Sequence, residues 1–147
     1  MPDDAHDLGP RDLMRAQATA ALGTLMAGAP YVSLVLVAFD ADGAPLLLLS
    51  RLAQHTRNLL ADANVSLLFD GTGGLEDPLT GPRLTVLGKI AACPDPAALA
   101  RYIERHPSAE VYAGFSDFRL YKVTIARAHS VAGFGQIRWI EAGALLG

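Results

Sequence analysis

The stretch "YVSLVLVAFDADGAPLLLLS", residues 31–50, decides the fold class of this chain. Its first nine residues are rich in β-branched and aromatic side chains, and they are too short and too apolar for a surface helix, so they predict a strand. The turn signal "DADGAP" at 40–45 then predicts a hairpin, with the leucine run behind it as the returning strand. Strands linked in this way favour an antiparallel sheet.

On the C-terminal side of this hairpin, short apolar runs between turn residues predict further strands. They lie at 65–69 and 83–93, with one or two more within 119–134. The segment 94–107 predicts a helix, and 136–147 reads as a short tail. The total is about six short strands with helices set between and after them.

On the N-terminal side, "GPRDLMRAQATAALGTLMAG" at 9–28 predicts a helix, with Pro10 suited to its first turn. Its apolar residues recur at helical spacing and would form a buried stripe. The stripe consists of Met14, Ala18, Ala21, Leu22 and Leu25.

Many short strands with few helices predict an α+β fold, mainly β with flanking helices, in which an antiparallel sheet closes into a small barrel. No repeat, low-complexity segment or linker divides the chain, so a single domain is predicted over 1–147, with 1–8 as a loose polar lead.

Composition narrows the function classes. The formal net charge of −3 argues against nucleic acid as the main partner, because phosphate backbones are bound by broad basic faces. Cys93 is the only cysteine, so no disulfide framework or thiolate metal cluster is expected. The longest strongly apolar stretch, 31–39, is far shorter than the ~20 residues of a membrane helix. The acidic start is unlike a secretory signal, and a cytoplasmic protein is predicted.

Hydrogen-bond donors gather in "SRLAQHTRNLLADAN", residues 50–64, where a predicted strand gives way to a helical pattern. The first turn of a helix offers unpaired N–H groups and the positive end of the helix dipole, so such a junction can bind an anion. Arginine side chains match phosphate oxygens, and hydroxyl groups add donors. The alternative is that Thr56 caps the helix and that the arginines are ordinary surface charges.

Two further segments are candidates for a binding site. Aromatic residues are dense at 112, 115, 118 and 121, and Asp117 between two of them is either a desolvated acid or a turn residue that bonds its own backbone. Gly133 and Gly135 flank Phe134, which would allow close approach to a flat ligand or mark a β-bulge.

The four histidines do not form a metal-binding set. His6, His55, His106 and His129 are spread along the chain, without a helical pair or a bracketing carboxylate. No resident metal site is therefore predicted.

The segments "LAQHTRNLLADANVSLL" (52–68) and "YAGFSDFRLY" (112–121) are specific in combination. With the strand segments around them, they resemble the pyridoxamine 5′-phosphate oxidase-like FMN-binding split barrels over roughly 28–135, with the haem-utilisation branch as the nearer match. The resemblance implies a six-stranded antiparallel split β-barrel of the FMN-binding type. It also implies a homodimer with two FMN sites at the subunit interface.

The same resemblance implies the cofactor-binding residues. At the phosphate end of FMN it places Ser50, His55, Thr56 and Arg57, with Arg51 nearby. The backbone of three residues would run along the isoalloxazine ring, and a polar contact would come from the other subunit. These residues are Val32, Ser33 and Leu34 for the ring, and Arg83 for the contact from the other subunit.

The resemblance supports three functions. The first is an FMN-binding flavoprotein that exchanges electrons with a small-molecule substrate, in which the flavin supplies the redox chemistry. The second is a haem-binding or haem-degrading protein, in which Asp117 matches an acidic residue near the haem. In that branch the histidine ligand lies in a C-terminal extension, and none of the twelve residues after Gly135 is histidine. His129 is then the histidine most able to face a groove. The third function is a non-catalytic carrier of flavin or haem.

Overall fold

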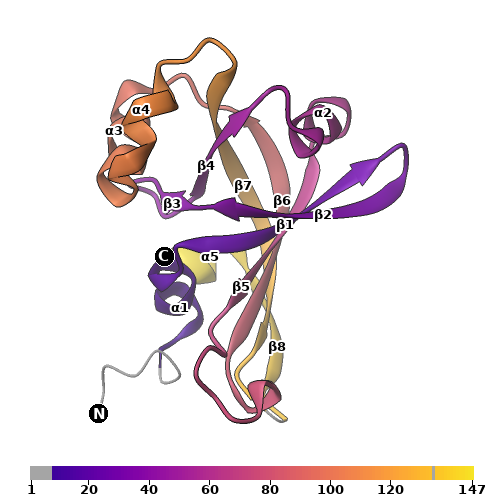
Figure 1. The fold of residues 1–147 in the computed structure, drawn as a ribbon. Helices are drawn as coiled ribbons and strands as arrows, with labels where there is room; N and C mark the ends of the chain where they lie inside the picture. The colour runs from indigo at the N-terminus through magenta and orange to yellow at the C-terminus, as the bar shows by residue number, and fades with distance from the viewer. Residues whose placement is uncertain (1–7, 134) are drawn as a thin grey trace.

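The computed structural model describes residues 8–133 and 135–147 as one curled antiparallel sheet of eight strands with short helices around it (Figure 1). The strands are β1 Thr19–Met26, β2 Ala29–Leu36, β3 Ala38–Phe39, β4 Pro45–Ser50, β5 Asn64–Asp70, β6 Arg83–Ala92, β7 Phe118–Val131 and β8 Ile137–Glu141. The helices are α1 Pro10–Ala16, α2 Gln54–Ala61, α3 Pro96–Arg105, α4 Glu110–Ala113 and α5 Ala142–Leu146, with single 3₁₀ turns at Pro78–Thr80 and Pro107–Ala109.

The order of the strands in the sheet is β2-β1-β5-β6-β7-β4-β3. Strand β7 is long enough to pair with β4 through its first residues and with β8 through its last, so β4 and β8 share one edge of it. The sheet curls until β2, at one end, lies near β4, which is next to the short strand β3 at the other end; β2 and β4 do not pair within the described residues. We call this opening the seam. The predicted split barrel is confirmed, with eight strands in place of six.

The curvature of the barrel has a local cause in β6. Its register with β7 shifts between Leu87 and Gly88, so that one residue of β7 is left over as a bulge. A Cβ atom at position 88 would meet the backbone oxygen of Thr124, so this close approach requires glycine. A bulge bends its strand and increases the local twist, which helps the sheet to close on itself.

The helix predicted over 9–28 is wrong beyond its first two turns. Only Pro10–Ala16 is helical, and Thr19–Met26 forms β1, which pairs with β2 along its whole length. The burial of alternate residues, Ala20, Leu22 and Thr24, follows the two-residue period of a strand. The residues on the other face of β1 are also small or apolar, and for this reason its apolar residues recur at helical spacing.

The opening hairpin also differs from its prediction. The apolar run at 31–39 divides into β2 and β3, and only β3 pairs with β4. The longer part of the run, β2, pairs with β1, and the sequence had predicted a helix in place of β1. The predicted tail 136–147 contains β8 and α5, whereas the strands near 65–69 and 83–93 and the helix near 94–107 are confirmed.

The apolar side chains form two cores. The larger one fills the barrel and includes Leu13 and Met14 of α1 and Leu145 of α5, so these two helices close one end of the barrel. The smaller one lies between α3 and the outer face of β4, and is centred on Tyr102 and Leu46. The smaller core holds the α3–α4 lobe beside the seam. No helix of the described residues has both the length and the apolar character to cross a membrane.

Candidate functional site

A groove of about 260 Å³ runs along the seam, and we call it the seam groove. Both ends of the curled sheet, the first turn of α2 and the α3–α4 lobe contribute to its walls. Its lining is mainly aliphatic and aromatic, which suits a flat apolar ligand. The lining residues are Leu34, Val35, Leu36, Leu48, Leu49, Ser50, Ala53, His55, Tyr102, Tyr112 and Phe118.

His55 joins α2 to the edge strand β2. Its Nδ1 atom lies 2.9 Å from the hydroxyl oxygen of Ser33, so the two predicted site residues form a hydrogen bond across the seam. Partial burial lowers the pKa of His55 below its ordinary value of 6.5. The imidazole is therefore neutral at neutral pH, with one ring nitrogen able to act as an electron-pair donor.

Ser50 and Asp117 join the end of β4 to the turn before β7. The Ser50 hydroxyl donates to the Asp117 carboxylate at 3.0 Å, and the backbone N–H of Arg51 donates to the Asp117 carbonyl at 2.7 Å. Asp117 does lie in a turn, but its side chain bonds to Ser50 and not to its own backbone. The Ser50 hydroxyl therefore already donates its hydrogen bond to the Asp117 carboxylate.

The first turn of α2 differs from the predicted cap. The residue at the N-cap is Ala53, whose side chain cannot accept a hydrogen bond. Thr56 is fully buried inside the first turn, and its hydroxyl finds no hydrogen-bond partner among the described residues. The alternative interpretation, in which Thr56 caps the helix, is therefore wrong. Arg51 and Arg57 are exposed at this end of the helix, and neither forms an ion pair within the described part of the chain.

The predicted ring-contact residues lie on β2, at the edge of the sheet. Val32 and Leu34 point outward, with 69% and 76% of their surface exposed, whereas Ser33 between them points toward His55. Among the described strands β2 pairs with β1 alone, so its other edge faces the seam. Its backbone can therefore contact a ligand in the seam groove.

Arg83 lies outside this group. It begins β6, next to the 70–82 loop at the lower end of the barrel in Figure 1, whereas α2 lies at the upper end. Its guanidinium donates to the carbonyl oxygens of Leu79 and Gly81 at 3.0 and 3.2 Å. One copy of the chain therefore does not bring Arg83 to the seam groove.

The other histidines have structural contacts. His106 is buried, its ring packs at a tilt against Tyr102, and its Nε2 atom lies 2.8 Å from the carbonyl oxygen of Val37. His129 lies on β7 and packs at a tilt against Trp139 of β8, with ring centroids 4.7 Å apart. His6 is outside the described residues. Within the described residues, the histidine at the seam groove is His55, so the expectation for His129 is wrong.

The dense aromatic segment builds one wall of the groove. Tyr112 of α4 and Phe118 of β7 pack with ring centroids 4.8 Å apart, and Phe115 packs on Phe118 at 6.3 Å. Tyr121, the fourth member, is buried in the barrel core on the other face of β7. The glycines at 133 and 135 belong to a different feature, because both have positive φ angles in the turn between β7 and β8. Phe134 lies outside the described residues.

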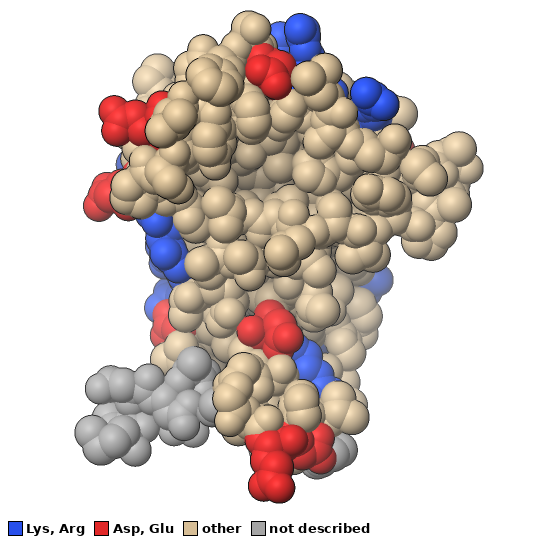
Figure 2. All heavy atoms as spheres, viewed as in Figure 1, with Lys and Arg blue, Asp and Glu red and all other residues tan. Residues whose placement is uncertain are grey.

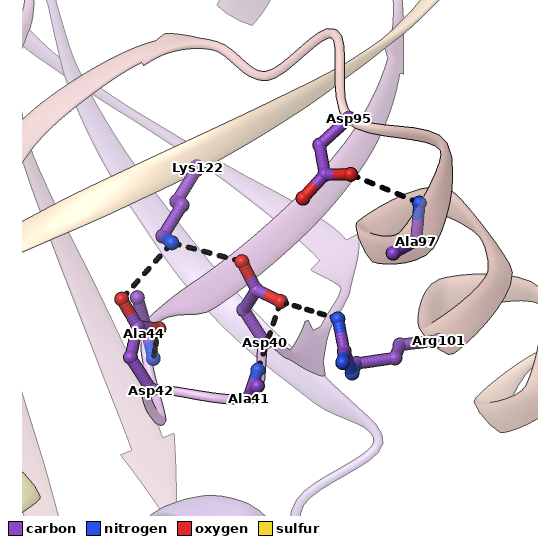
Figure 3. Close-up of polar contacts among 8 residues, drawn as sticks. All are labelled: Asp40, Ala41, Asp42, Ala44, Asp95, Ala97, Arg101 and Lys122. Carbon is purple, nitrogen blue, oxygen red and sulfur yellow. Dashed lines mark hydrogen bonds and ion pairs between the residues drawn. The ribbon is translucent and has the colours of Figure 1, made fainter.

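A cluster that the sequence did not reveal holds the wall in place (Figure 3). Asp40 of the β3–β4 turn accepts hydrogen bonds from Arg101 of α3 at 3.0 Å and Lys122 of β7 at 2.8 Å. Lys122 also pairs with Asp42 at 3.0 Å. The segment 40–45 reads only as a turn, because its partners are 61 and 82 residues away.

The middle of the face seen in Figure 2 carries few charged side chains. In Figure 2 the surface between the α3–α4 lobe and the β1–β2 hairpin is uncharged and hollowed, with acidic and basic side chains toward its margins. An apolar groove with aromatic walls and one imidazole, with two exposed arginines on the neighbouring residues of the α2 start, suits a flat conjugated ligand with anionic ends. Among the described residues, no three metal-binding side chains lie close enough to hold an ion by themselves.

Comparisons with known proteins point to one family. The family model described as "Pyridoxamine 5'-phosphate oxidase" matches residues 11–132. The chloroplastic heme oxygenase HOZ of Arabidopsis thaliana is 37% identical over 111 residues, which are 72% of this chain and 33% of that protein. The chain therefore spans about a third of the length of this curated relative.

Solved structures agree on the fold. A heme binding protein from Mycobacterium smegmatis superposes with a TM-score of 0.84 at 27% identity, over 99% of this chain and 61% of that one. HutZ from Vibrio cholerae, described as a heme storage protein, superposes with a TM-score of 0.68 at 20% identity, over 78% of this chain and 86% of that one. At 20% identity, the second likeness shows the fold alone.

Proposed function

Because this chain belongs to the pyridoxamine 5′-phosphate oxidase family, we propose that its seam groove binds a flat conjugated prosthetic group, and that this group is haem. The observation that carries the proposal is the position of His55, which is bonded to Ser33 in a groove lined mainly by aliphatic and aromatic side chains. Two relatives support it, since the 37% identical protein is named a heme oxygenase and the 27% identical structure a heme binding protein.

The residues of the groove fit haem in three respects. Aliphatic side chains from β2 and β4 and the rings of Tyr112 and Phe118 would contact the macrocycle. Arg51 and Arg57, exposed near the start of α2, would attract the propionates while these remain in solvent. His55 supplies a nitrogen donor, and haem when bound would supply an iron that can react with oxygen.

FMN is the second candidate, because the exposed arginines and the first turn of α2 also suit a phosphate. Two features of the chain weigh against it. The Ser50 hydroxyl already donates to Asp117, whose carboxylate would repel a phosphate at that point. The Thr56 hydroxyl is closed off from the surface, so it could contact a phosphate only after a rearrangement. An FMN-dependent redox reaction on a small-molecule substrate therefore stays the second proposal.

The test is a parallel titration of the purified full chain with haemin and with FMN, followed by absorption spectroscopy and fluorescence quenching. We expect saturable haemin binding with a shifted Soret band, and FMN binding at least about tenfold weaker, as one lost charge-assisted hydrogen bond would produce. The matched variant is Phe118→Ala, which removes a groove wall but leaves both arginines in place. It should weaken haemin binding. Tight FMN binding that displaces haemin would reverse the order of the two proposals.

We also propose that two copies associate through the β1–β2 face. Exposed apolar side chains on β2 support this arrangement, which would let Arg83 of one copy approach the groove of the other. A cytoplasmic location stays a prediction from the sequence.

A further inference from the structure

We infer that His55 is the axial ligand of the haem iron and that Ser33 positions it. The inference rests on the proposed function and adds to it the atom that binds the iron. The family resemblance places the histidine ligand in the C-terminal part of the chain. Our inference places it in the first turn of α2, where His55 forms its hydrogen bond to β2 across the seam.

The orientation of the ring follows from its hydrogen bond. A histidine that binds a metal uses one neutral ring nitrogen, while the other nitrogen donates its proton to a nearby oxygen. Nδ1 of His55 lies 2.9 Å from Oγ of Ser33. When Nδ1 carries the proton and donates it to Ser33, the lone pair is on Nε2, which is then the nitrogen that binds iron.

The position of His55 allows it to reach a ligand in the groove. Its partly buried side chain lines the seam groove and is bonded to Ser33 of β2. The charged groups at this end of α2 are Arg51, Arg57 and, beside Ser50, Asp117. The carboxylate of Asp117 accepts a hydrogen bond from the Ser50 hydroxyl.

The alternative ligands in the described residues are less suitable. The Nε2 atom of His106 is engaged by the carbonyl oxygen of Val37. His129 packs against Trp139 at the β7–β8 hairpin, which does not line the groove. Among the tyrosines of the groove, burial raises the pKa of Tyr102 to about 12, which keeps it protonated and unable to ligate as a phenolate. Tyr112 is the remaining competitor, and the experiment includes it.

The experiment compares haemin complexes of the full-length wild type and four variants by absorption and resonance Raman spectroscopy. His55→Ala should lose the histidine-type Soret band and bind haemin at least about tenfold more weakly, and added imidazole should restore the band. His129→Ala and Tyr112→Phe should keep the wild-type spectrum. Ser33→Ala should keep the Soret band but lower the iron–histidine stretching frequency of the ferrous complex, because the donated proton loses its acceptor.

Circular dichroism and thermal unfolding show whether each variant is folded. If His55→Ala is not folded, His55→Gln replaces it, since an amide can keep the bond to Ser33 but is a poor iron ligand. An unchanged Soret band and haemin affinity in a folded His55 variant would overturn the ligand assignment and leave haem binding intact. Loss of the band in Tyr112→Phe or His129→Ala would also overturn it. A wild type that binds no haemin would overturn the proposed function itself.

Discussion

Asp40 shows how one buried carboxylate connects three parts of the chain. Its side chain is only 8% exposed, and it joins the β3–β4 turn to Arg101 of α3 and Lys122 of β7. The hydrogen bond from Lys122 lowers the pKa of Asp40 more than burial raises it. Because α3 supports the lobe that carries Tyr112, this residue stabilises one wall of the seam groove from behind.

We predict that Asp40→Asn lowers the free energy of unfolding at pH 7 by about 1–2 kcal/mol, since it keeps an acceptor but removes the charge. This figure allows for solvent screening of the partly exposed Arg101 and Lys122. The measurement is urea denaturation, with Asp42→Asn as the control. Asp42 is 60% exposed, so the change there should be smaller.

The pH dependence of this difference follows from the direction of the shift. The folded-state pKa of Asp40 lies below its ordinary value of 3.8, so the folded chain binds fewer protons than the unfolded chain in that range. The stabilisation is complete above about pH 4 and disappears as the pH falls through the lowered pKa. The gap between wild type and Asp40→Asn should close there. A gap that stays constant down to pH 2 would show that the ionised carboxylate is not the cause.

Thr56 and Thr24 form a matched pair of buried hydroxyl groups. Oγ1 of Thr24 accepts a hydrogen bond from Asn58 at 3.0 Å, whereas Oγ1 of Thr56 has no partner among the described residues. Thr56→Val should therefore raise the free energy of unfolding by about 1 kcal/mol, because an unsatisfied buried group is removed. Thr24→Val should lower it by a similar amount. Chemical denaturation of both variants checks the opposite signs, and equal signs would contradict the assignment.

At the scale of residues, the sequence predicted the members of the candidate site better than it predicted their hydrogen-bond partners. Ser33, Ser50 and His55 were all predicted as site residues; Ser50 and His55 line one groove, and Ser33 is bonded to His55. Their partners could not be predicted from local pattern. The Ser50–Asp117 bond joins residues 67 positions apart, and only the folded sheet brings them together.

The strand β1 shows how an element can be misread. Its sequence is rich in alanine and leucine, which favour helices, and its weakly apolar second face hides the two-residue period. Tertiary pairing with β2 and β5 outweighs this propensity. Gly23 was the available signal, because glycine disfavours a helix interior and here lets β1 approach Ser66 of β5.

The bulge in β6 offers a test of how the barrel curves. A Cβ atom at Gly88 would meet backbone of Thr124, which cannot turn away as a side chain could. Gly88→Ala should therefore lower the free energy of unfolding by about 2 kcal/mol through overpacking. Gly114→Ala is the control, since a Cβ atom there meets nothing within 4 Å and its φ angle is −91°. Thermal unfolding compares them. Equal melting temperatures would mean that the bulge does not depend on glycine.

At the scale of the molecule, the seam is both the site and the incomplete part of the barrel. The family resemblance in the sequence predicted the split barrel, because the order of its segments is specific even though single elements are not. It could not predict how the seam is lined, since the lining comes from β2, β4, α2, α3, α4 and β7. Those elements meet only because the sheet curls.

The same incomplete edge leads to the prediction of a dimer. Strand β2 pairs on one side only and exposes Val32 and Leu34, whereas a monomer rarely leaves such an apolar edge uncovered. We expect the wild type at micromolar concentration to sediment with twice the chain mass of 15.5 kDa.

Val32→Asp should shift the protein toward the monomer, because a carboxylate at the interface would be buried without a partner. Val111→Asp is the matched control. Val111 on α4 is 76% exposed but belongs to the α3–α4 lobe and not to the β1–β2 face, so the sedimenting mass should not change. Both variants replace exposed side chains, so folding should be unaffected, and circular dichroism confirms it. A wild type that sediments only at 15.5 kDa would rule out the dimer, and with it the approach of Arg83 to a neighbouring groove.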